Sequence, residues 1–428
     1  MFVGIDIGTS SVRCTAIDAS RRIVAGSRAS LPVPQNPQTG WFHQEPALWW
    51  QAVRDCLKDL KAKLPENPIQ AIAIDGTSST VLLVDKDNQP VSNALMYNDS
   101  RASKLEPELT GFIPAESITR SASSSLSKAI YLLQDKTVRQ RAKYIMHQAD
   151  WINAMLTGNT GISDENNCLK LGYDSKRQQW PEWIGHAPFE ISGMLPDAVP
   201  SGTDIGAIDP GIALELGLPA GIRIIAGTTD STASTLATGI SQPGEAVTTY
   251  GTTLVMKIVS SKPVTSVEHG IYSHHLPNGY WLVGGASNSG GNVLDKYFNP
   301  DQIVHLSSQI DSSTPSGLNY YPLAGKGERF PVNDPEFKAE LSPRPKSDVV
   351  FLQGIFEGFA RIEKQAYQLI SSLGGPVATH ILTAGGKAAD NPALMSIRAN
   401  IIGLPVEKAP ETEASFGSAM IAGRLLPP

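Results

Sequence analysis

The chain has 428 residues, of which 41% are hydrophobic and 18% charged, and its formal net charge is −6. This length can bury two or three cores, and the mildly acidic balance gives nucleic acid or an anionic membrane no electrostatic attraction. Three widely spaced cysteines indicate a reducing compartment, and neither a hydrophobic leader nor a membrane-length apolar run is present. We therefore expect a cytoplasmic α/β protein, monomeric or homodimeric, that binds neither nucleic acid nor membrane.

Short strands and helices alternate through the first half of the chain. Apolar runs separated by turns of a few residues predict an antiparallel meander at the start. Leu48, Val53, Leu57 and Leu60 recur at helical spacing. The expected elements are strands at 2–7, 12–17 and 22–27, a helix at 46–63, strands at 71–75 and 81–84, helical segments through 124–157, a strand at 223–226 and a short helix to 238.

The opening pattern returns past residue 240. A strand at 245–250, a Gly-Thr-Thr turn and a returning strand at 254–259 repeat the order of the first hairpin. This repeat predicts two related lobes with a central cleft, divided where Gly239 and a Gln-Pro-Gly turn end the preceding helix. The predicted domains are an N-terminal lobe at 1–238 and a C-terminal lobe at 239–428. Packing of the last helix against the first lobe is an alternative that the sequence leaves open.

Two hairpin turns are candidates for phosphate binding. The turn from Gly8 through Thr9 and Ser10 follows a strand that contains Asp6, and its N–H and hydroxyl groups suit an anion. A carboxylate there can hold Mg²⁺ through water, because this hard cation keeps much of its hydration shell. The second turn is 251–253. Each turn taken singly is equally well an ordinary hairpin connection, whereas one from each lobe would clamp a polyphosphate.

A third glycine turn lies near the C-terminus. A strand at 381–384 runs into Gly385 and Gly386, and a helix follows from about Asn391. Two glycines at a strand-to-helix turn permit close approach of a planar ligand such as adenine, although ordinary connections use the same pair. The sequence has neither a Walker-type Gly-x-x-x-x-Gly-Lys-Ser/Thr loop nor a Rossmann-type Gly-x-Gly-x-x-Gly after the first strand, which disfavours both of those nucleotide-binding modes.

Asp230 follows an apolar strand and begins a short helix. A carboxylate at that position can accept the proton of an attacking alcohol and orient it for displacement at phosphorus. The local sequence by itself favours a plainer role, as the N-cap of a helix that starts at Ser231. The two roles are compatible with each other.

Together these segments resemble the FGGY carbohydrate kinases over nearly the whole chain and in the same order. The segments that carry the resemblance are 4–10, 40–46, 97–101, 156–158 with 163–164 and 172–174, 226–230, 250–253, 284–288, 327–331, 357–359, and 384–386 with 391–392. The resemblance implies an α/β fold of the actin-like ATPase (ribonuclease H-like) type, with two lobes, and phosphorylation of a sugar by Mg·ATP.

The resemblance also implies roles for individual residues. Asp6 would organise Mg²⁺ and Asp230 would act as the catalytic base that also contacts the sugar. The remaining assignments are Gly8, Thr9, Ser10, Gly251 and Thr252 for the ATP phosphates, Gly385, Gly386 and Asn391 for the adenine, and Ser78, Asn98 and Asp99 for the sugar pocket. The C-terminal lobe would then be the nucleotide-binding lobe.

Two details refine the resemblance. Lys387 stands where family members commonly have a third glycine, and the spacing to Asn391 is one residue longer, which leaves the adenine contacts open. Residues 75–80 and 270–274 are most similar to the short D-ribulose (xylulose-kinase-like) kinases of cyanobacteria and plants. We therefore expect D-ribulose as the substrate, with D-xylulose as the alternative.

The rival of another class is an actin-fold protein that only binds or hydrolyses ATP. A non-catalytic member would be expected to lack Asp6 or Asp230, and both are present. An ATPase of the chaperone or filament type would lack the sugar-pocket segment around Asn98 and Asp99. These observations favour direct in-line transfer to a sugar hydroxyl, with Asp230 as the base.

Overall fold

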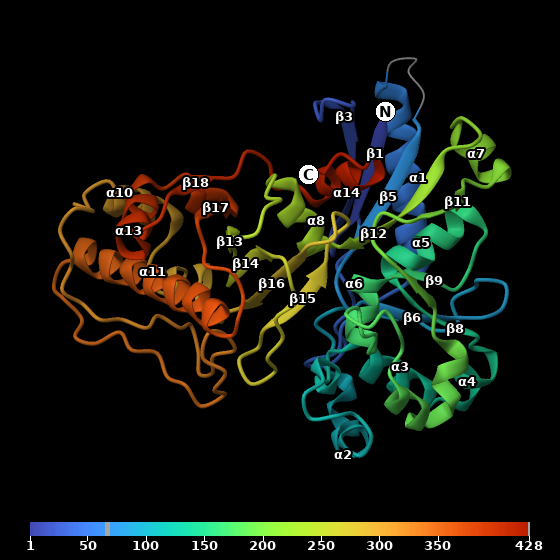
Figure 1. The fold of residues 1–428 in the computed structure, drawn as a ribbon, viewed down its shortest axis with the longest axis horizontal. Helices are drawn as coiled ribbons and strands as arrows, with labels where there is room; N and C mark the ends of the chain where they lie inside the picture. Colours follow the sequence, from blue (N-terminus) through green and yellow to red (C-terminus); the bar gives the residue numbers. More distant parts are fainter. Residues whose placement is uncertain (65–68, 427–428) are drawn as a thin grey trace. The chain divides into compact units, whose positions relative to one another are not determined.

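The computed structural model describes residues 1–64 and 69–426, which form two compact units. The first unit comprises residues 1–237 together with 413–426, and the second comprises residues 238–412. Each unit is built around a six-stranded mixed sheet covered by helices (Figure 1). The final two residues of the expected C-terminal lobe, 427–428, lie outside the described residues.

The sheet of the first unit begins with the expected meander. β1 pairs antiparallel with β2 and parallel with β5, and β5 in turn pairs parallel with β12. The third strand extends three residues beyond the predicted end at 27. In order across the sheet the strands are β11 (Asp204–Ala207), β12 (Arg223–Thr229), β5 (Ala71–Gly76), β1 (Phe2–Ile7), β2 (Ser11–Ile17) and β3 (Ile23–Ser30).

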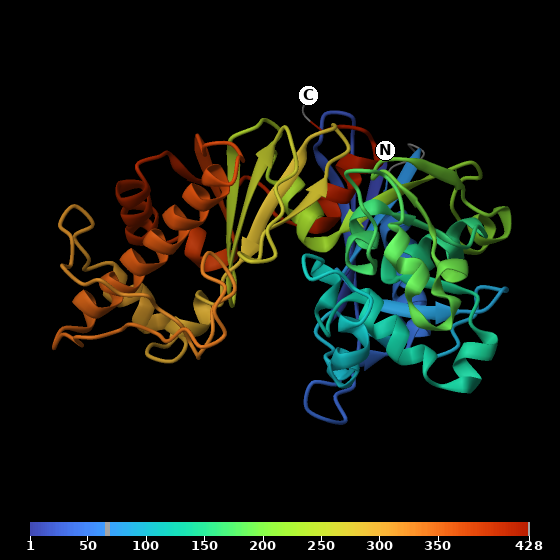
Figure 2. The ribbon, with the colours of Figure 1, turned by 60° about the horizontal axis from the view of Figure 1, so that its bottom comes forward.

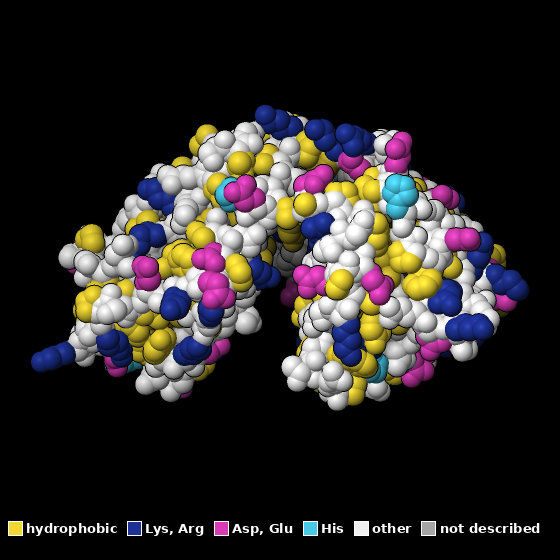
Figure 3. All heavy atoms as spheres, turned by 90° about the horizontal axis from the view of Figure 1, so that it is seen from below, with side chains coloured by type: hydrophobic (Ala, Val, Ile, Leu, Met, Phe, Trp, Pro, Cys, Tyr) yellow, Lys and Arg dark blue, Asp and Glu magenta, His cyan; other side chains and the backbone are white. Residues whose placement is uncertain are grey.

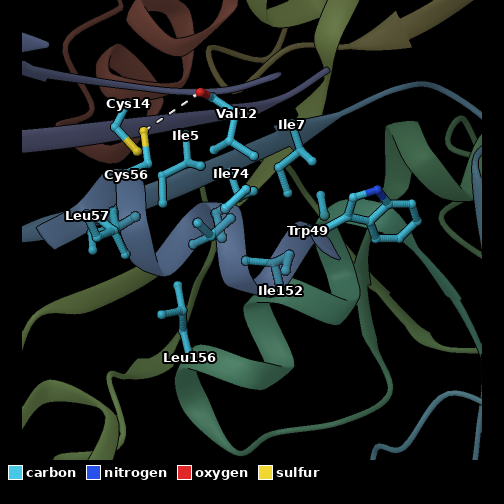
Figure 4. Close-up of a cluster of buried hydrophobic side chains, with 14 of the residues drawn as sticks. Ile5, Ile7, Val12, Cys14, Trp49, Cys56, Leu57, Ile74, Ile152 and Leu156 are labelled. Carbon is cyan, nitrogen blue, oxygen red and sulfur yellow. Dashed lines mark hydrogen bonds between the residues drawn. The ribbon is translucent and has the colours of Figure 1, made fainter. Parts of the chain in front are cut away.

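One face of this sheet carries the main apolar core. Side chains alternate along a strand, so Val3, Ile5 and Ile7 of β1 all point to the same face and are fully buried. They belong to one cluster with residues of α1 (Pro46–Lys63), which has the predicted bounds, and of α5 (Gln148–Thr157). Figure 4 shows Ile5 and Ile7 in this cluster. Burying a side chain of this size contributes about 1.5–3 kcal/mol, so this face supplies much of the stability of the unit.

The opposite face of β1 carries Gly4 and Asp6 and is covered by α14 (Ala414–Ala422), the last helix of the chain (Figure 1). A Cβ atom on Gly4 would lie 1.9 Å from the backbone oxygen of Ser415, so only glycine allows this approach. Gly417 makes an equally close approach to Ala233 on α8 (Asp230–Ala237). The last helix therefore packs backbone to backbone within the first unit.

A smaller sheet completes the first unit, and it includes one strand that the sequence did not predict. Helical segments do occupy most of 124–157, but the unpredicted strand β8 (Tyr144–His147) lies among them and pairs with β6 (Val81–Val84). A buried run of four residues has no periodicity that separates a strand from a helix.

The remaining elements of the unit are β4 (His43–Gln44), β7 (Ala94–Leu95), β9 (Ile162–Asp164), β10 (Asp197–Val199), α2 (Glu106–Thr110), α3 (Ser125–Leu133), α4 (Lys136–Arg141), α6 (Glu165–Cys168) and α7 (Pro210–Leu216), with 3₁₀ turns at Arg101–Leu105, Ile118–Arg120, Leu169–Leu171, Glu182–His186 and Pro188–Met194.

The second unit repeats the opening pattern, as the sequence predicted. β13 pairs antiparallel with β14 and parallel with β17, which matches the pairing of β1 with β2 and β5. Across the sheet the strands are β15 (Tyr272–His275), β16 (Trp281–Ala286), β14 (Leu254–Ser260), β13 (Glu245–Tyr250), β17 (His380–Ala384) and β18 (Val406–Lys408). The long α11 (Asp348–Ser372) and α13 (Pro392–Ile402) lie side by side against this sheet (Figure 2), and the short helices are α9 (Gly291–Leu294), α10 (Pro300–Ser307) and α12 (Gly386–Ala389).

Charged side chains of both signs are interspersed on the face of each unit drawn in Figure 3. No broad area of a single charge is visible on this face, in line with the modest net charge of the sequence. Within residues 1–64 and 69–426, no helix is both long and apolar enough to cross a membrane.

Candidate active site

Three aspartates converge at one edge of the first unit's sheet. Asp6 near the end of β1 stands in register with Asp75 near the end of the parallel strand β5. Asp230 follows the last residue of β12, the next parallel strand. The carboxyl ends of parallel strands form the usual ligand-binding edge of an α/β sheet. The geometry thus brings together the two aspartates that the sequence singled out.

Asp6 is buried, and its surroundings oppose ionisation. Burial is the main cause that raises the pKa of Asp6 to about 6, and the negative charge of Asp230 adds to it. The guanidinium of Arg13 acts in the other direction, with Nη1 donating to Asp6 Oδ2 at 3.2 Å. A cation that binds beside Asp6 would favour the ionised form of its carboxyl group.

Asp75 is a member of the cluster to which no role was assigned. It is fully buried, and its Oδ2 accepts a hydrogen bond of 2.5 Å from Ser418 Oγ of α14. Its Oδ1 has no hydrogen-bond partner in the part of the chain that the structure describes. Burial, and then the charge of Asp6, raises the pKa of Asp75 well above its ordinary value. The sequence contained a pattern that could have identified Asp75. It lies near the end of β5, two residues before the turn residue Thr77, just as Asp6 lies two residues before Gly8.

The donor set at this edge fits a hydrated Mg²⁺. No group of three His, Cys, Asp or Glu side chains within the described residues is arranged to hold a metal ion. Mg²⁺ does not need such a cage, since it usually binds one or two carboxylates and completes its shell with water and substrate phosphates. The Asp6 carboxylate beside Asp230 supplies oxygen ligands of that kind, and the metal role of Asp6 stays a prediction.

The first candidate phosphate turn lies directly after Asp6. It closes tightly, because the N–H of Gly8 donates to the oxygen of Ser11 at 3.0 Å. Gly8 and Thr9 are half-buried, whereas Ser10 is exposed. Hydroxyl and N–H groups are therefore presented two to four residues beyond the carboxylate cluster, as phosphate binding requires.

Asp230 is half-buried at the first position of α8. Its Oδ1 accepts a hydrogen bond of 2.7 Å from the N–H of Ser231, so the carboxylate does contact the start of its own helix. This hydrogen bond uses one acceptor position of the carboxylate, whose two oxygens can accept several hydrogen bonds. The helix contact and the role of base are thus compatible.

The three residues expected in the sugar pocket differ in solvent exposure and in the hydrogen bonds that they already make. Ser78 is half-buried in the turn after β5, and Asn98 is exposed. Asp99 is fully buried, and its oxygens accept from Arg101 and from the N–H of Phe42 at 2.6–3.0 Å. These hydrogen bonds fasten the loop that carries Asn98. A contact between Asp99 and the sugar stays a prediction.

A buried lysine that the sequence gave no reason to select stands behind this pocket. Lys128 of α3 is fully buried, and its Nζ donates to the carbonyl oxygens of Ser79 at 2.6 Å and Met96 at 2.8 Å. Those carbonyls belong to the segments that carry Ser78 and Asn98. Burial is the main cause that holds the pKa of Lys128 well below its ordinary value. Lys128 thus links the two segments of the expected sugar pocket.

In the second unit the two other glycine turns lie against each other. Gly385 follows β17 with a φ of +103°, and a Cβ atom there would lie 2.2 Å from the oxygen of Tyr250. Tyr250 immediately precedes the exposed turn at Gly251 and Thr252, whose carbonyls accept from the N–H groups of 291 and 292. Only glycine at 385 allows this contact, which joins the expected phosphate turn to the expected adenine turn.

A cavity of about 790 Å³ lies in the second unit, between α10 and the segment that joins α12 to α13. Its lining includes Val304 and Ile310 as well as Lys387 and Asn391. Asn391 also caps α13, because its Oδ1 accepts from the N–H of Leu394 at 3.1 Å. The cavity has the size and mixed lining of a small-molecule site, and it contains one of the predicted adenine-binding residues. Gly385 and Gly386 are not part of this lining.

Comparison with protein families identifies the chain. The N-terminal domain model of the FGGY family of carbohydrate kinases matches residues 1–237, and the C-terminal domain model matches residues 246–426. The chain belongs to the FGGY family of carbohydrate kinases. It is an ATP-dependent sugar phosphotransferase with the actin-like two-domain fold of that family.

Individual relatives agree with this assignment. A xylulose kinase from Staphylococcus epidermidis is 23% identical over 98% of this chain and 87% of the relative. A xyloylose kinase from Brucella ovis has a similar structure, with a TM-score of 0.88 and 23% identity over 98% of this chain and 89% of that one. Glycerol kinase from Plasmodium falciparum with ADP gives a TM-score of 0.85 and 20% identity over 99% and 88% of the two chains.

Proposed function

We propose that this FGGY kinase transfers the γ-phosphoryl group of ATP directly to a hydroxyl of a ketopentose, with D-ribulose as the preferred substrate. The observation that carries the proposal is the placement of Asp230 and Asp6 at the same edge of the sheet, at the ends of β12 and β1, the two parallel strands on either side of β5. One carboxylate there can accept the proton of the hydroxyl while the other attracts a cation. A protein that only binds nucleotide has no need of both.

The residues of the first unit would bind and activate the sugar. Asp230 accepts the proton of the attacking hydroxyl and orients its oxygen toward phosphorus. Ser78 and Asn98 hydrogen-bond the other hydroxyls of the sugar, and Lys128 and Asp99 keep the segments that carry them in place. Thr9 and Ser10 donate hydrogen bonds to the transferred phosphoryl group, where charge accumulates in the transition state.

The residues of the second unit would bind the nucleotide. Gly251 and Thr252 present N–H and hydroxyl groups to the phosphates, and Gly385, Gly386 and Asn391 border the base and ribose near the 790 Å³ cavity. Mg²⁺, held by Asp6 largely through water, would neutralise charge on the phosphates of bound ATP. Transfer requires the sugar held by the first unit and the phosphates held by the second to meet in one complex.

The preference for D-ribulose rests only on the resemblance of residues 75–80 and 270–274, read from the sequence, to the short ribulose kinases. D-Xylulose is the second candidate, because several relatives of this chain are named xylulose kinases. The two ketopentoses differ at one stereocentre. A single hydrogen bond to the hydroxyl at that centre, gained or left unmade, is enough to choose between them.

An ADP-release assay with Mg·ATP tests the proposal. The acceptors are D-ribulose, D-xylulose, gluconate and glycerol, with a control that contains no sugar. We expect the highest kcat/KM for D-ribulose and little release in the control. Higher kcat/KM for D-xylulose would replace the substrate and keep the mechanism, whereas equal release with and without sugar would overturn the proposal.

A further inference from the structure

The core of the second unit contains a charged pair that the catalytic scheme does not use. Glu363 of α11 and Arg398 of α13 both have 0% exposed side-chain surface. Arg398 donates two parallel hydrogen bonds, from Nη2 to Glu363 Oε1 at 2.7 Å and from Nε to Oε2 at 2.8 Å. The pair is planar and bidentate, the arrangement that gives an Arg–carboxylate contact most directional specificity.

Both partners also bond to the central strands of the sheet. Thr248 of β13 donates to Glu363 Oε1 at 2.5 Å, and the hydroxyl of Tyr250 donates to Oε2 at 3.2 Å. Arg398 donates from Nη1 to Thr383 Oγ1 of β17 at 2.6 Å, and its guanidinium lies 4.7 Å from the centre of the Tyr250 ring. The charged pair therefore contacts β13 and β17 at once.

Each contacted element leads directly to a proposed nucleotide-binding residue. Tyr250 precedes Gly251, and Thr383 lies two residues before Gly385. Arg398 sits on the helix that Asn391 caps. Thr248 and Thr383 stand opposite each other on the paired strands, so the contacts form one cluster beneath the two turns. The cluster thus connects α13 to both strands through the side chain of Arg398.

Stability alone does not account for such a pair. Desolvation of two charges offsets most of their attraction, and well-packed apolar residues of similar volume are often as stable or more stable. What an apolar replacement cannot supply is direction, because five directional hydrogen bonds allow one arrangement of α11, α13, β13 and β17. The Glu363–Arg398 pair is therefore better explained by the arrangement that it imposes on these elements than by its contribution to stability.

We infer that Glu363 and Arg398 are positioning residues that hold the turns at Gly251 and Gly385 and the capping residue Asn391 in register for nucleotide binding. The inference rests on the proposed assignment of these residues to ATP. Neither side chain reaches the nucleotide, since both are fully buried. Their action is indirect, through the strands and the helix that they join.

Titration calorimetry of ADP binding to the full-length protein tests this inference. The key variant is the charge-free double substitution Glu363→Met with Arg398→Met, which removes the directed contacts while keeping an apolar core. The single variant Glu363→Gln accompanies it. We expect an ADP Kd raised at least about 10-fold in the folded double variant, because small displacements of binding groups cost affinity steeply. The KM for the sugar should stay within about 2-fold of the wild-type value.

The control is Glu357→Gln, which removes another buried carboxylate of α11. Glu357 accepts from Ser316 and Gln353 rather than from the strands that lead to the turns. Its ADP Kd should match that of the wild type at comparable thermal stability. A folded double variant that binds ADP as tightly as the wild type would overturn the inference. A wild-type protein that binds no ADP would instead count against the proposed nucleotide site itself.

Discussion

Asp6 and Asp75 stand opposite each other on two paired parallel strands, with both carboxyl groups buried. Each is harder to ionise there than in water, because the apolar surroundings disfavour charge and negative neighbours add to the effect. Ionisation of both carboxyl groups is therefore unfavourable unless a cation lies beside them.

The first prediction concerns the unfavourable ionisation of Asp6. The pKa of Asp6 is raised to about 6, so between about pH 4 and 6 the folded state binds more protons than the unfolded state and stability falls as pH rises. At pH 7.5 Asp6 is ionised in both states, and the destabilisation of the folded state by its buried charge is complete. The free energy of unfolding of Asp6→Asn should therefore be about 1–3 kcal/mol higher than that of the wild type at this pH, and the variant should lose kinase activity.

Urea unfolding at pH 4 and pH 7.5 measures the effect, and the gain should vanish at the lower pH. The matched control is Asp18→Asn. Asp18 accepts from Ser20 and Arg22, and these hydrogen bonds lower its pKa, so its replacement should give no gain at pH 7.5. An Asp6→Asn protein less stable than the wild type at neutral pH would contradict the account.

The second prediction is the pH dependence of turnover. Asp6 must be ionised to attract Mg²⁺, and its raised pKa means that this form is lost as pH falls through about 6. We expect kcat/KM for Mg·ATP to be level above about pH 7 and to fall below pH 6. More Mg²⁺ should move the midpoint to lower pH, because the cation competes with the proton. A profile that is flat from pH 5 to 8 would exclude Asp6 from this role.

The third prediction concerns the proposed base. Asp230→Asn keeps the size of the side chain and a carbonyl oxygen for the N–H of Ser231, but it removes the proton acceptor. The value of kcat should fall by roughly 10²–10⁴-fold, the usual worth of general-base catalysis. Calorimetry should find ADP binding unchanged. Turnover close to the wild-type value would show that another group accepts the proton.

The fourth prediction concerns the buried lysine. Lys128→Met removes the amino group that joins the carbonyls of Ser79 and Met96 but keeps most of the volume. The segments that carry Ser78 and Asn98 should lose their fixed separation, which raises the sugar KM by about 10-fold and leaves the KM for ATP unchanged. Lys136→Met, on the exposed side of α4, is the control. Equal changes in both KM values would indicate general loosening of the fold instead.

The fifth prediction compares two adjacent glycines. A Cβ at Gly385 would meet the backbone oxygen of Tyr250 at 2.2 Å, and the φ of +103° is strained for any other residue. A Cβ at Gly386 meets nothing within 4 Å, and its φ is +44°. Gly385→Ala should therefore weaken ADP binding at least about 10-fold, and Gly386→Ala far less. Similar affinities in the two variants would separate this turn from nucleotide binding.

The sequence by itself determined the features that depend on neighbouring residues. Apolar runs and glycine turns located the two hairpins, helical spacing placed α1 at 46–63, and the half-chain repeat predicted two units of the same pairing pattern. Asp6 and Asp230 were selected because each lies at the end of an apolar strand. All of these are local properties, which periodicity and turn chemistry encode directly.

Only the tertiary structure decided which distant residues meet. It placed Asp75 beside Asp6, brought the N–H of Phe42 to the carboxylate of Asp99, inserted β8 into a segment expected to be helical, and joined Glu363 to Arg398. The partners in these contacts lie up to about 70 residues apart, and parallel pairing, burial and helix packing arise from the whole chain condensing at once. No local pattern records the partner of a buried charge, so the positioning groups of this kinase became visible only in the fold.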